Sequence, residues 1–264
     1  MKIGKLKKLK TEKQDTVKYW LPFGDESILL NDLIGKQVSL NFTGNIYCID
    51  TGKKIKKAYG QGYSWESFIT LPECDQCIFQ PELCHYSRGT CRDPKWGEQH
   101  CLKPHVVYLS LTSGVKVGIT RKTQVPTRWM DQGAVKAIKI CEVKDRLTSG
   151  KVEVEIAKDM ADKTNWRNML KNVYTDVDLL SIKASVLKKH EKLFSTHKVE
   201  ISDDEVYEFN YPVEQYPEKV SSFNFDKKSE VSGKLMGIKG QYLIFDTGVI
   251  NIRKYQGYEV NLEY

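Results

Sequence analysis

The sequence contains no long hydrophobic run and no segment of low complexity. Its lysine-rich beginning, MKIGKLKKLK, is not followed by the apolar stretch that a secretory signal requires, and no run is long enough to cross a membrane. We therefore expect a cytoplasmic protein without a membrane partner. At 264 residues, 40% of them hydrophobic, the chain can bury the core of one large domain or two modest ones, and its oligomeric state stays open.

Acidic residues are in the minority, and their distribution is uneven. The chain carries 41 Lys+Arg against 34 Asp+Glu, a formal net charge of +7. Residues 1–20 hold seven lysines and two acidic residues, whereas residues 200–218 are acidic. Further basic residues gather at 53–57 and 116–128. This distribution favours a polyanionic partner, RNA or DNA, and a merely solvated basic surface is the alternative.

Cysteine is sparse except in one short segment. Five of the seven cysteines lie between residues 74 and 101, namely Cys74, Cys77, Cys84, Cys91 and Cys101. His85 and His100 each stand beside one of them. Structural zinc takes four thiolate or imidazole ligands from a short stretch of chain. The spacing of Cys74 and Cys77 lets one turn aim two sulfurs at one ion, and the other cysteines and histidines can complete the shell.

A disulfide cluster is the alternative explanation of this segment. The odd number of cysteines and the absence of a secretory signal argue against it, because disulfides are rare in a reducing cytoplasm. We therefore expect a structural zinc ion. At least one of the five cysteines must then be spare, unless two metals share the set. Cys48 and Cys141 stand alone in apolar surroundings, which is typical of ordinary core residues.

Both ends of the chain show the alternation and turn residues of β-structure. Residues 37–42 and 45–49 predict strands, and Asp50-Thr51-Gly52 predicts a turn into a strand at 53–59. The pattern of residues 44–52 returns at 240–248. An internal duplication is one explanation, and we favour the other, the same turn chemistry used twice. We expect the two ends to pack together as one small sheet or barrel.

The middle of the chain mixes strands and helices. Residues 105–111, 115–120 and 137–143 predict three strands. Pro126 opens a short helix that Gly133 ends. Ser149 is a candidate cap of a second helix that buries Val152, Ile156 and Met160, and an amphipathic pattern predicts a longer helix at about 176–196, with Leu179 and Leu180 among its buried residues. A linker is expected at 211–217.

This order of elements resembles the GIY-YIG nuclease domain over about residues 105–170. The strand Val106-Val107-Tyr108-Leu109 is similar to the first motif of that family, and Lys116-Val117-Gly118-Ile119-Thr120 is similar to the second. An arginine on the following helix and a glutamate on a later helix complete the resemblance, and they correspond to Arg128 and Glu153. The fold that it implies is a small α/β domain with a phosphodiesterase centre.

The resemblance implies a role for each matched residue. Tyr108 would orient or activate the nucleophile, Arg128 would stabilise charge on the phosphate, and Glu153 would hold Mg²⁺ together with water and phosphate oxygens. Glu155 is a second candidate for the metal, although helical geometry turns it to another face. Lys116 stands where the family has its second tyrosine. A lysine can neutralise phosphate charge but is a poor general base unless it is desolvated, which places hydrolysis in question.

Over its whole length the chain also resembles a bacterial family known as domain of unknown function 2797. The matching blocks are residues 81–86, 89–92, 116–121, 128–134, 162–167 and 237–242. The fold class expected is α+β, with a GIY-YIG-like central domain, a Cys-rich zinc module and β-rich terminal segments. Its parts are a β-rich segment at 1–70, the zinc module at 71–104, the GIY-YIG-like domain with a helical extension at 105–200, and a β-rich segment at 201–264.

These features together predict a zinc-containing protein that binds nucleic acid, RNA in preference to DNA. Arg128-Trp129 and Trp166-Arg167 each set a cation beside an indole, a pair suited to phosphate and unstacked bases, although both tryptophans can equally be core residues. The nuclease-like centre would act as a Mg²⁺-dependent phosphodiesterase. The alternatives are an RNA-binding module without turnover and a thiol- or zinc-dependent RNA-modifying enzyme that uses a spare cysteine, Cys91 or Cys84.

Overall fold

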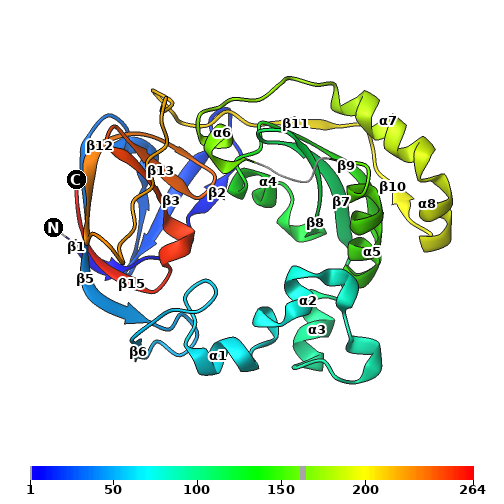
Figure 1. Ribbon diagram of the computed structural model, residues 1–264, viewed down its shortest axis with the longest axis horizontal. Coiled ribbons are helices and arrows are strands. Elements are labelled where there is room, and N and C mark those ends of the chain that lie inside the picture. The colour runs from blue at the N-terminus through cyan, green and yellow to red at the C-terminus, as the bar shows by residue number, and fades with distance from the viewer. Residues whose placement is uncertain (1, 161–164) are drawn as a thin grey trace.

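The computed structural model describes residues 2–160 and 165–264, and it has the α+β composition that the sequence predicts. Strands from both chain ends form one side of the molecule, and a second sheet with its helices forms the other (Figure 1). Within the described residues, no helix has the length and apolar character needed to span a bilayer.

The terminal sheet joins the two ends of the chain. Its strands, in spatial order, are β1 (Lys2–Lys5), β15 (Tyr258–Glu263), β5 (Gln37–Tyr47), β12 (Glu230–Lys239), β13 (Tyr242–Phe245) and β14 (Gly248–Asn251), with β6 (Lys54–Ile55) beside β5. The expectation that both ends pack as one sheet is therefore confirmed. A smaller antiparallel sheet beside it contains β2 (Lys10–Glu12), β3 (Lys18–Phe23) and β4 (Glu26–Leu29).

Strand β5 differs from the prediction of two separate strands. It runs without interruption through Gly44, whose φ of 86° places it in the left-handed region that glycine adopts at low cost. The pairing with β15 shifts register at this point, so Gly44 lies in a bulge rather than in a turn. The strand expected at 53–59 is reduced to β6. The similar sequence at 240–248 instead forms the turns around the β13–β14 hairpin, so the two copies differ in structure.

The central sheet is built from the middle of the chain. It contains β10 (Glu200–Ile201), β9 (Lys136–Val143), β7 (His105–Leu111) and β8 (Val115–Arg121) in spatial order, with β11 (Val206–Glu208) also beside β9. The three strands predicted between residues 105 and 143 are confirmed, as is the short helix after Pro126, which is α4 (Thr127–Asp131). Gly133 follows it with a φ of 71°. Every pair of neighbours in this sheet is antiparallel.

Helix α5 (Arg146–Ala157) begins earlier than predicted. Its cap is Asp145, whose carboxylate accepts a 2.7 Å hydrogen bond from the Thr148 amide. Ser149 lies inside the first turn instead, where its hydroxyl donates to the Arg146 carbonyl. Val152 and Ile156 are fully buried against the central sheet, as expected.

The long helix predicted at 176–196 is two helices, α7 (Leu179–Lys189) and α8 (Glu191–His197). The chain leaves helical geometry at His190, which has φ −107° and ψ 21°. Leu179 is buried, but Leu180 is 41% exposed, so the expected buried face includes one leucine that faces solvent. Figure 1 shows α5, α7 and α8 together beside the central sheet. The short helix α6 (Trp166–Leu170) packs against the terminal sheet through Met169 and Leu170.

A segment with little regular structure, hereafter the bridge (residues 59–101), connects the two sides of the molecule. It contains α1 (Trp65–Thr70), α2 (Gln76–Phe79), α3 (Pro94–His100) and the 3₁₀ turns η2 (Pro72–Cys74), η3 (Pro81–Leu83) and η4 (Tyr86–Arg88). At one end the Ile49 amide donates to the Gly62 carbonyl at 2.9 Å, and at the other the Arg146 amide donates to the Cys101 carbonyl at 2.8 Å. Gly150 on α5 lets η3 approach, because a Cβ there would lie 2.6 Å from the Glu82 nitrogen.

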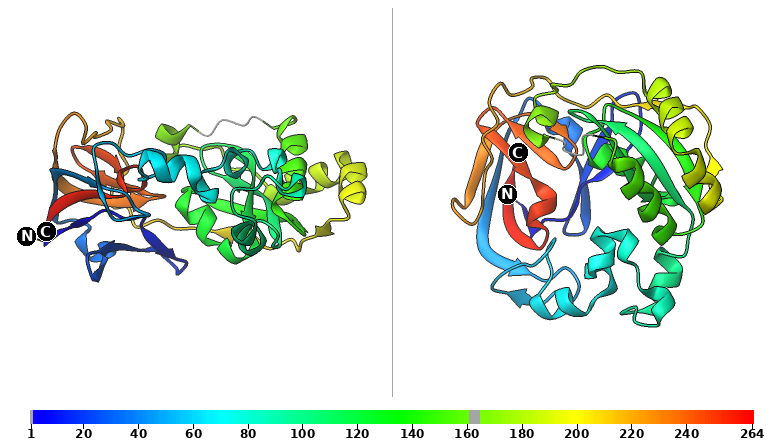
Figure 2. Two further views of the ribbon diagram at one scale, coloured as in Figure 1. Left: turned by 90° about the horizontal axis from the view of Figure 1, so that it is seen from below. Right: turned by 45° about the vertical axis from the view of Figure 1, so that its right-hand side comes forward.

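The opposite connection between the two sides is a shared hydrophobic core. One continuous cluster includes Leu9 near the first strands, Tyr108 of β7 and Trp129 of α4. Tyr211, in the segment expected to be a linker, is buried and donates a 2.7 Å hydrogen bond to the Ala134 carbonyl. The molecule is therefore a flattened ring, closed by the bridge on one side and by this core on the other (Figure 2).

Candidate nucleic-acid site and cysteine cluster

Tyr108 is the centre of the candidate site. Its neighbour on β8 is Gly118, directly opposite in the antiparallel register. A Cβ at position 118 would lie 2.7 Å from both Cζ and Oη of Tyr108, so only glycine leaves room for this ring. The Tyr108 side chain is fully buried, with the edge of its ring against Trp129. The tyrosine of the first motif and the glycine of the second are thus in direct contact.

Gln132 connects Tyr108 to Arg128. In the amide orientation that gives both ends a partner, Gln132 donates to Tyr108 Oη at 3.1 Å and accepts from Arg128 Nε at 3.3 Å and Nη2 at 3.2 Å. Arg128 and Gln132 are four residues apart at the end of α4, a spacing that places them on one face. Sequence reasoning did not single out Gln132. Its effect is to hold the guanidinium group in a fixed position.

Glu153 of α5 lies within electrostatic reach of this group. Burial raises the pKa of Tyr108, the Arg128 charge opposes that increase, and the Glu153 charge adds to it. The tyrosine is therefore protonated at neutral pH, and it positions Gln132 rather than serving as a strong base. Arg128 and Glu153 are half-buried. Tyr108 and Arg128 thus meet through Gln132, and Glu153 lies within electrostatic reach of Tyr108.

Lys116 lies on the same face of the sheet as Tyr108, two residue pairs along the hairpin. It lies opposite Ser110, and Gly118 lies opposite Tyr108, so the two side chains are diagonal neighbours. Lys116 is half-buried and engaged in an interaction of its own. Its position on the edge strand β8 is compatible with contact to an anion bound at Arg128.

Two further arginines surround the site and were not predicted. Burial lowers the pKa of Arg146, and the charge of Arg128 lowers it further while Glu153 opposes the change. Burial also lowers the pKa of Arg253, in the turn η6 (Ile252–Tyr255), and Arg128 adds to that effect. Arg253 donates to Gln61 Oε1 at 2.9 Å. No local pattern identifies either residue, because each approaches Arg128 only through the fold.

Four of the five clustered cysteines line one small cavity. They are Cys77, Cys84, Cys91 and Cys101, and the cavity of about 20 Å³ has room for one water-sized sphere. Burial raises the pKa of Cys77 to about 12, with neighbouring charge at Asp75, Cys84 and Cys101 adding to the increase. Burial also raises the pKa of Cys101, and Cys84 and Cys91 add to it. Cys77 and Cys101 therefore each lie within electrostatic reach of other cysteines that line the cavity.

Cysteine and histidine side chains, which are donors that zinc takes, line this cavity. Within residues 2–160 and 165–264, the one group of three ligand atoms that all lie within 4.8 Å of one another comes from Asp75, Cys77 and His85. His85 Nε2 is 3.4 Å from an Asp75 oxygen, to which Arg92 Nε also bonds at 3.0 Å. Ligation by Cys77, Cys84, Cys91 and Cys101 together would therefore require their sulfurs to move closer and to lose their protons.

Cys74 and His100 lie outside this cavity. His100 stacks on Trp96 at 4.3 Å between ring centroids, and its Nδ1 bonds to the Trp96 carbonyl at 2.9 Å. Burial raises the pKa of Cys74 to about 11, and the charges that add to this include Glu73 and Cys48. Cys74 lies within electrostatic reach of Cys48 and does not line the cavity, so the close spacing of Cys74 and Cys77 in sequence does not bring both side chains to it.

Cys48 differs from the ordinary core cysteine that its sequence context indicates. It is buried, which by itself would raise its pKa, but hydrogen bonds from Thr51, Ser67 and Ser64 lower the pKa to about 6. The Ser64 amide donates to Cys48 Sγ at 3.2 Å. Cys48 also lines a cavity of about 580 Å³, hereafter the lysine cavity, whose wall includes Lys5, Lys7, Lys8 and Lys10. Cys141 is buried and unremarkable, as expected.

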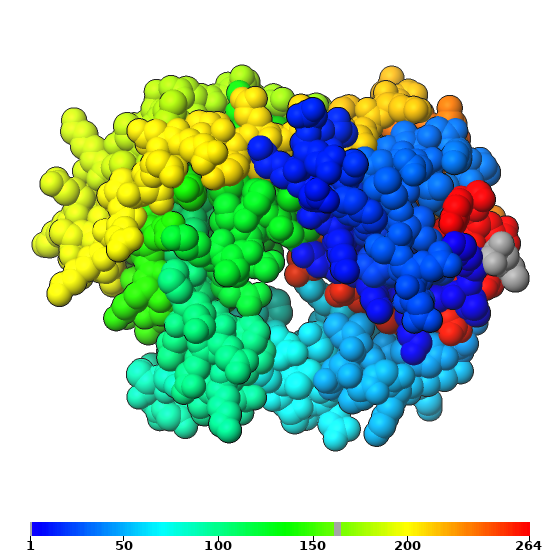
Figure 3. Space-filling view, turned by 180° about the vertical axis from the view of Figure 1, so that it is seen from behind, coloured from blue at the N-terminus to red at the C-terminus, as the bar shows by residue number. Residues whose placement is uncertain are grey.

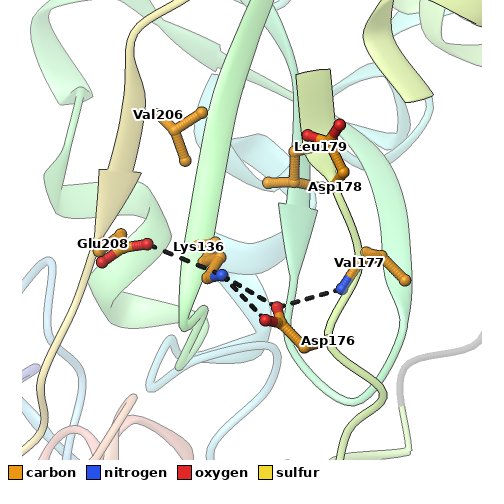
Figure 4. Close-up of a pocket in the computed structure, with 7 residues that line it drawn as sticks. All are labelled: Lys136, Asp176, Val177, Asp178, Leu179, Val206 and Glu208. Atoms are coloured by element: carbon orange, nitrogen blue, oxygen red, sulfur yellow. Dashed lines mark hydrogen bonds and ion pairs between the residues drawn. The ribbon is translucent and has the colours of Figure 1, made fainter. Parts of the chain in front are cut away.

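A surface pocket of about 430 Å³ lies at the first residue of β9 and the start of α7 (Figure 4). Its cation, Lys136, is paired with Asp176 at 2.9 Å and lies 3.7 Å from Glu208. Figure 4 shows these side chains directed at one another rather than into open space. The pocket is therefore an ion-pair cluster and does not compete with the Arg128 site.

A family model described as "Protein of unknown function (DUF2797)" matches residues 35–260. No curated protein and no solved structure gives a match. Two of the sequence blocks that resemble this family meet in the structure, because Gln241 Nε2 donates to Asp131 Oδ1 at 2.8 Å. A third block, at 162–167, falls partly on residues 162–164, which lie outside the described residues.

Proposed function

This chain belongs to the DUF2797 family, and we propose that it binds nucleic acid, RNA in preference to DNA, at the site around Arg128. The observation that carries the proposal is the hydrogen-bonded series from Tyr108 through Gln132 to Arg128, with Glu153 beside it. An arginine held by a buried network needs little reorganisation to receive a phosphate, and its planar fork matches phosphate oxygens.

The surrounding charge supports a phosphate-bearing ligand. Arg146 and Arg253 stand within reach of Arg128, and Asp131 and Glu153 are the acidic residues near them. Lys8 extends the positive charge and pairs with Asp131. A polyanion would relieve the repulsion among the three guanidinium groups.

The arrangement also supports a GIY-YIG-like core. The contact between Tyr108 and Gly118, the arginine on α4 and the glutamate on α5 follow the order that the resemblance implies. Glu153 would hold Mg²⁺ with water and phosphate oxygens, and the ion would supply charge neutralisation at the phosphate. Arg128 would orient the phosphate, Lys116 would contact it, and Tyr108 would hold Gln132 and Arg128 in place.

Binding without turnover is the second candidate, and two observations favour it. Burial keeps Tyr108 protonated, and Lys116 occupies the position of the second tyrosine of the resemblance. Neither side chain is then a ready general base at neutral pH. The protein would be an RNA platform built on a nuclease-like fold.

Zinc would be structural, held by Cys77, Cys84, Cys91 and Cys101. The support is their shared cavity and its position beside Arg146, whose guanidinium donates to the Ile78 carbonyl in the bridge. A metal there would fix the bridge against α5, and therefore also fix Arg146. Because Cys84 and Cys91 line the cavity, a thiol-dependent RNA-modifying reaction at either of them has less support than metal ligation.

Salt-dependent RNA binding tests the proposal. We expect Arg128→Ala to weaken binding of a labelled RNA about tenfold or more and to reduce the slope of log affinity against log salt by about 0.7–0.9. Lys188→Ala removes one exposed charge on the outer helix α7 and is the matched control. Equal affinities for wild type and Arg128→Ala would refute the site. Cleavage is tested by comparing wild type with Glu153→Gln in Mg²⁺, and identical products, or none from either, would exclude it.

A further inference from the structure

An opening passes through the ring, and it is visible in the space-filling view between the terminal strands, the bridge and the central domain (Figure 3). Lys8 closes one rim by pairing with Asp131 of α4. The bridge closes the other through the Gly62 and Cys101 contacts already described. The opening is therefore bounded on all sides by covalent chain and hydrogen-bonded contacts.

Cations from both halves of the ring lie within electrostatic reach of one another. Arg253 comes from η6 in the terminal half, and Arg128 and Arg146 come from α4 and α5 in the central half. Figure 1 shows η6, the red turn, on the inner side of the terminal strands toward α4. The charge of Arg128 reaches both other arginines. The fold thus brings Arg253 near two arginines that are more than 100 positions away in sequence.

The lysine cavity continues this basic path. Lys5, Lys7 and Lys10 are exposed, whereas Leu6 and Leu9 between them are buried, so the extended segment presents its cations outward. Gln256 connects the cavity to the arginines. Its Oε1 accepts from the Lys8 amide at 3.1 Å, and its Nε2 donates to the carbonyl of Gln61, the residue that also binds Arg253.

The bridge also carries an aromatic surface. Trp65 is 56% exposed and packs on Tyr59 at 5.0 Å between centroids. Lys57 Nζ lies 5.1 Å from the Tyr59 ring. Exposed aromatic rings beside lysines are the features on which unpaired bases stack. A duplex, whose bases are already stacked and paired, gains nothing from such a surface.

The closed ring and the exposed Trp65 together favour a single strand over a duplex. A flexible single strand can pass one end through a bounded opening and present unpaired bases to an aromatic ring, whereas a duplex is stiff and its bases are already stacked.

We propose that a single-stranded nucleic acid with a free end threads through the opening, its phosphates contacting Arg128, Arg146, Arg253 and the lysine cavity. This inference rests on the proposed function and names its substrate class. Entry of a strand into a closed ring requires an end, so the topology of the ligand, and not only its sequence or charge, controls binding.

Blocking the ends of one RNA tests threading on the wild-type protein. A single-stranded RNA of about 20 nucleotides carries biotin at both ends, and streptavidin is added either before or after the protein. Streptavidin added first should reduce binding at least tenfold. Streptavidin added second should trap the complex, so that competitor RNA no longer displaces it over hours. The same RNA as a blunt duplex should bind at least tenfold more weakly than the free single strand.

Each result supports or overturns the inference. Equal binding for both orders of addition, or complexes that dissociate normally after the ends are blocked, would overturn threading even if Arg128→Ala still weakened binding, and that pattern would leave the proposed function intact. Duplex binding equal to single-strand binding would also overturn it. No binding of any RNA by the wild type would refute the proposed function itself, and threading with it.

Discussion

The contact between Tyr108 and Gly118 makes Gly118→Ala the sharpest test of how the site is built. The added Cβ would lie 2.7 Å from Tyr108 Cζ and Oη, closer than carbon and oxygen atoms approach without repulsion. Tyr108 cannot easily move, because it is fully buried and packed on Trp129. Overpacking of this kind costs about 1–3 kcal/mol. Glycine-to-alanine changes in strands otherwise stabilise by about 0.5–1 kcal/mol, so the sign of the effect is diagnostic.

Thermal unfolding measures this prediction directly. For a protein of this size each kcal/mol lowers Tm by about 2–4 °C. Gly114→Ala, in the turn of the same hairpin, is the control, since its added Cβ meets no atom within 4 Å. We expect Gly118→Ala to lower Tm and Gly114→Ala to leave it unchanged or slightly raised.

A double variant tests whether the Tyr108 ring is the source of this cost. Tyr108→Leu removes both Cζ and Oη, the atoms that the new Cβ would meet at 2.7 Å, so Gly118→Ala should cost less in that background, by about 0.5–3 kcal/mol. A neutral or stabilising Gly118→Ala, or an unchanged cost in the leucine background, would show that Tyr108 is not seated against β8 as described.

Three further predictions concern buried titratable groups and the metal. Burial lowers the pKa of Lys239 to about 8, so the unfolded chain binds this proton more tightly and the free energy of unfolding should rise between pH 8 and 10. In urea unfolding, Lys239→Met should remove that rise and stabilise the protein at pH 7 by as much as about 3 kcal/mol. An unchanged pH profile would contradict this. Burial lowers the pKa of His105 to about 4, so the free energy of unfolding should fall by about 3 kcal/mol as the pH drops from about 6.5 to 4. When unfolding is followed by circular dichroism, the free energy of unfolding of His105→Gln should depend less on pH in this range than that of wild type. Elemental analysis should find one zinc per chain in wild type and Cys74→Ser but less in Cys84→Ser, and loss of zinc from Cys74→Ser alone would contradict the assignment of the cavity.

The sequence predicted correctly those strands and helices whose ends are marked by residues close to them in the chain. The strands at 105–143 are short runs rich in apolar and β-branched residues that are bounded by turn residues, and the helix at α4 has a proline before it and a glycine after it. The helix at α5 was placed late because Asp145 and Ser149 are both good caps, and only packing selects Asp145. The break between α7 and α8 at His190 was also missed, because no proline or glycine near it signals the end of a helix.

The site was predictable only in part, for a similar reason. Tyr108, Arg128 and Glu153 belong to one contiguous segment whose order of elements resembles a known family. Arg253 reaches the same place from the far end of the chain, and nothing near it in sequence indicates this. The cysteines show that a clear local pattern can also mislead. The short spacing of Cys74 and Cys77 favours a shared ion, but in η2 and α2 the two sulfurs have different neighbours.

The central claim is that Arg128, held by Gln132, receives a phosphate of a nucleic acid. The most direct test is the salt dependence of RNA affinity for wild type and Arg128→Ala at matched pH. The account predicts weaker binding for Arg128→Ala and a slope smaller by about one counterion. Superimposable salt curves for the two proteins would contradict it.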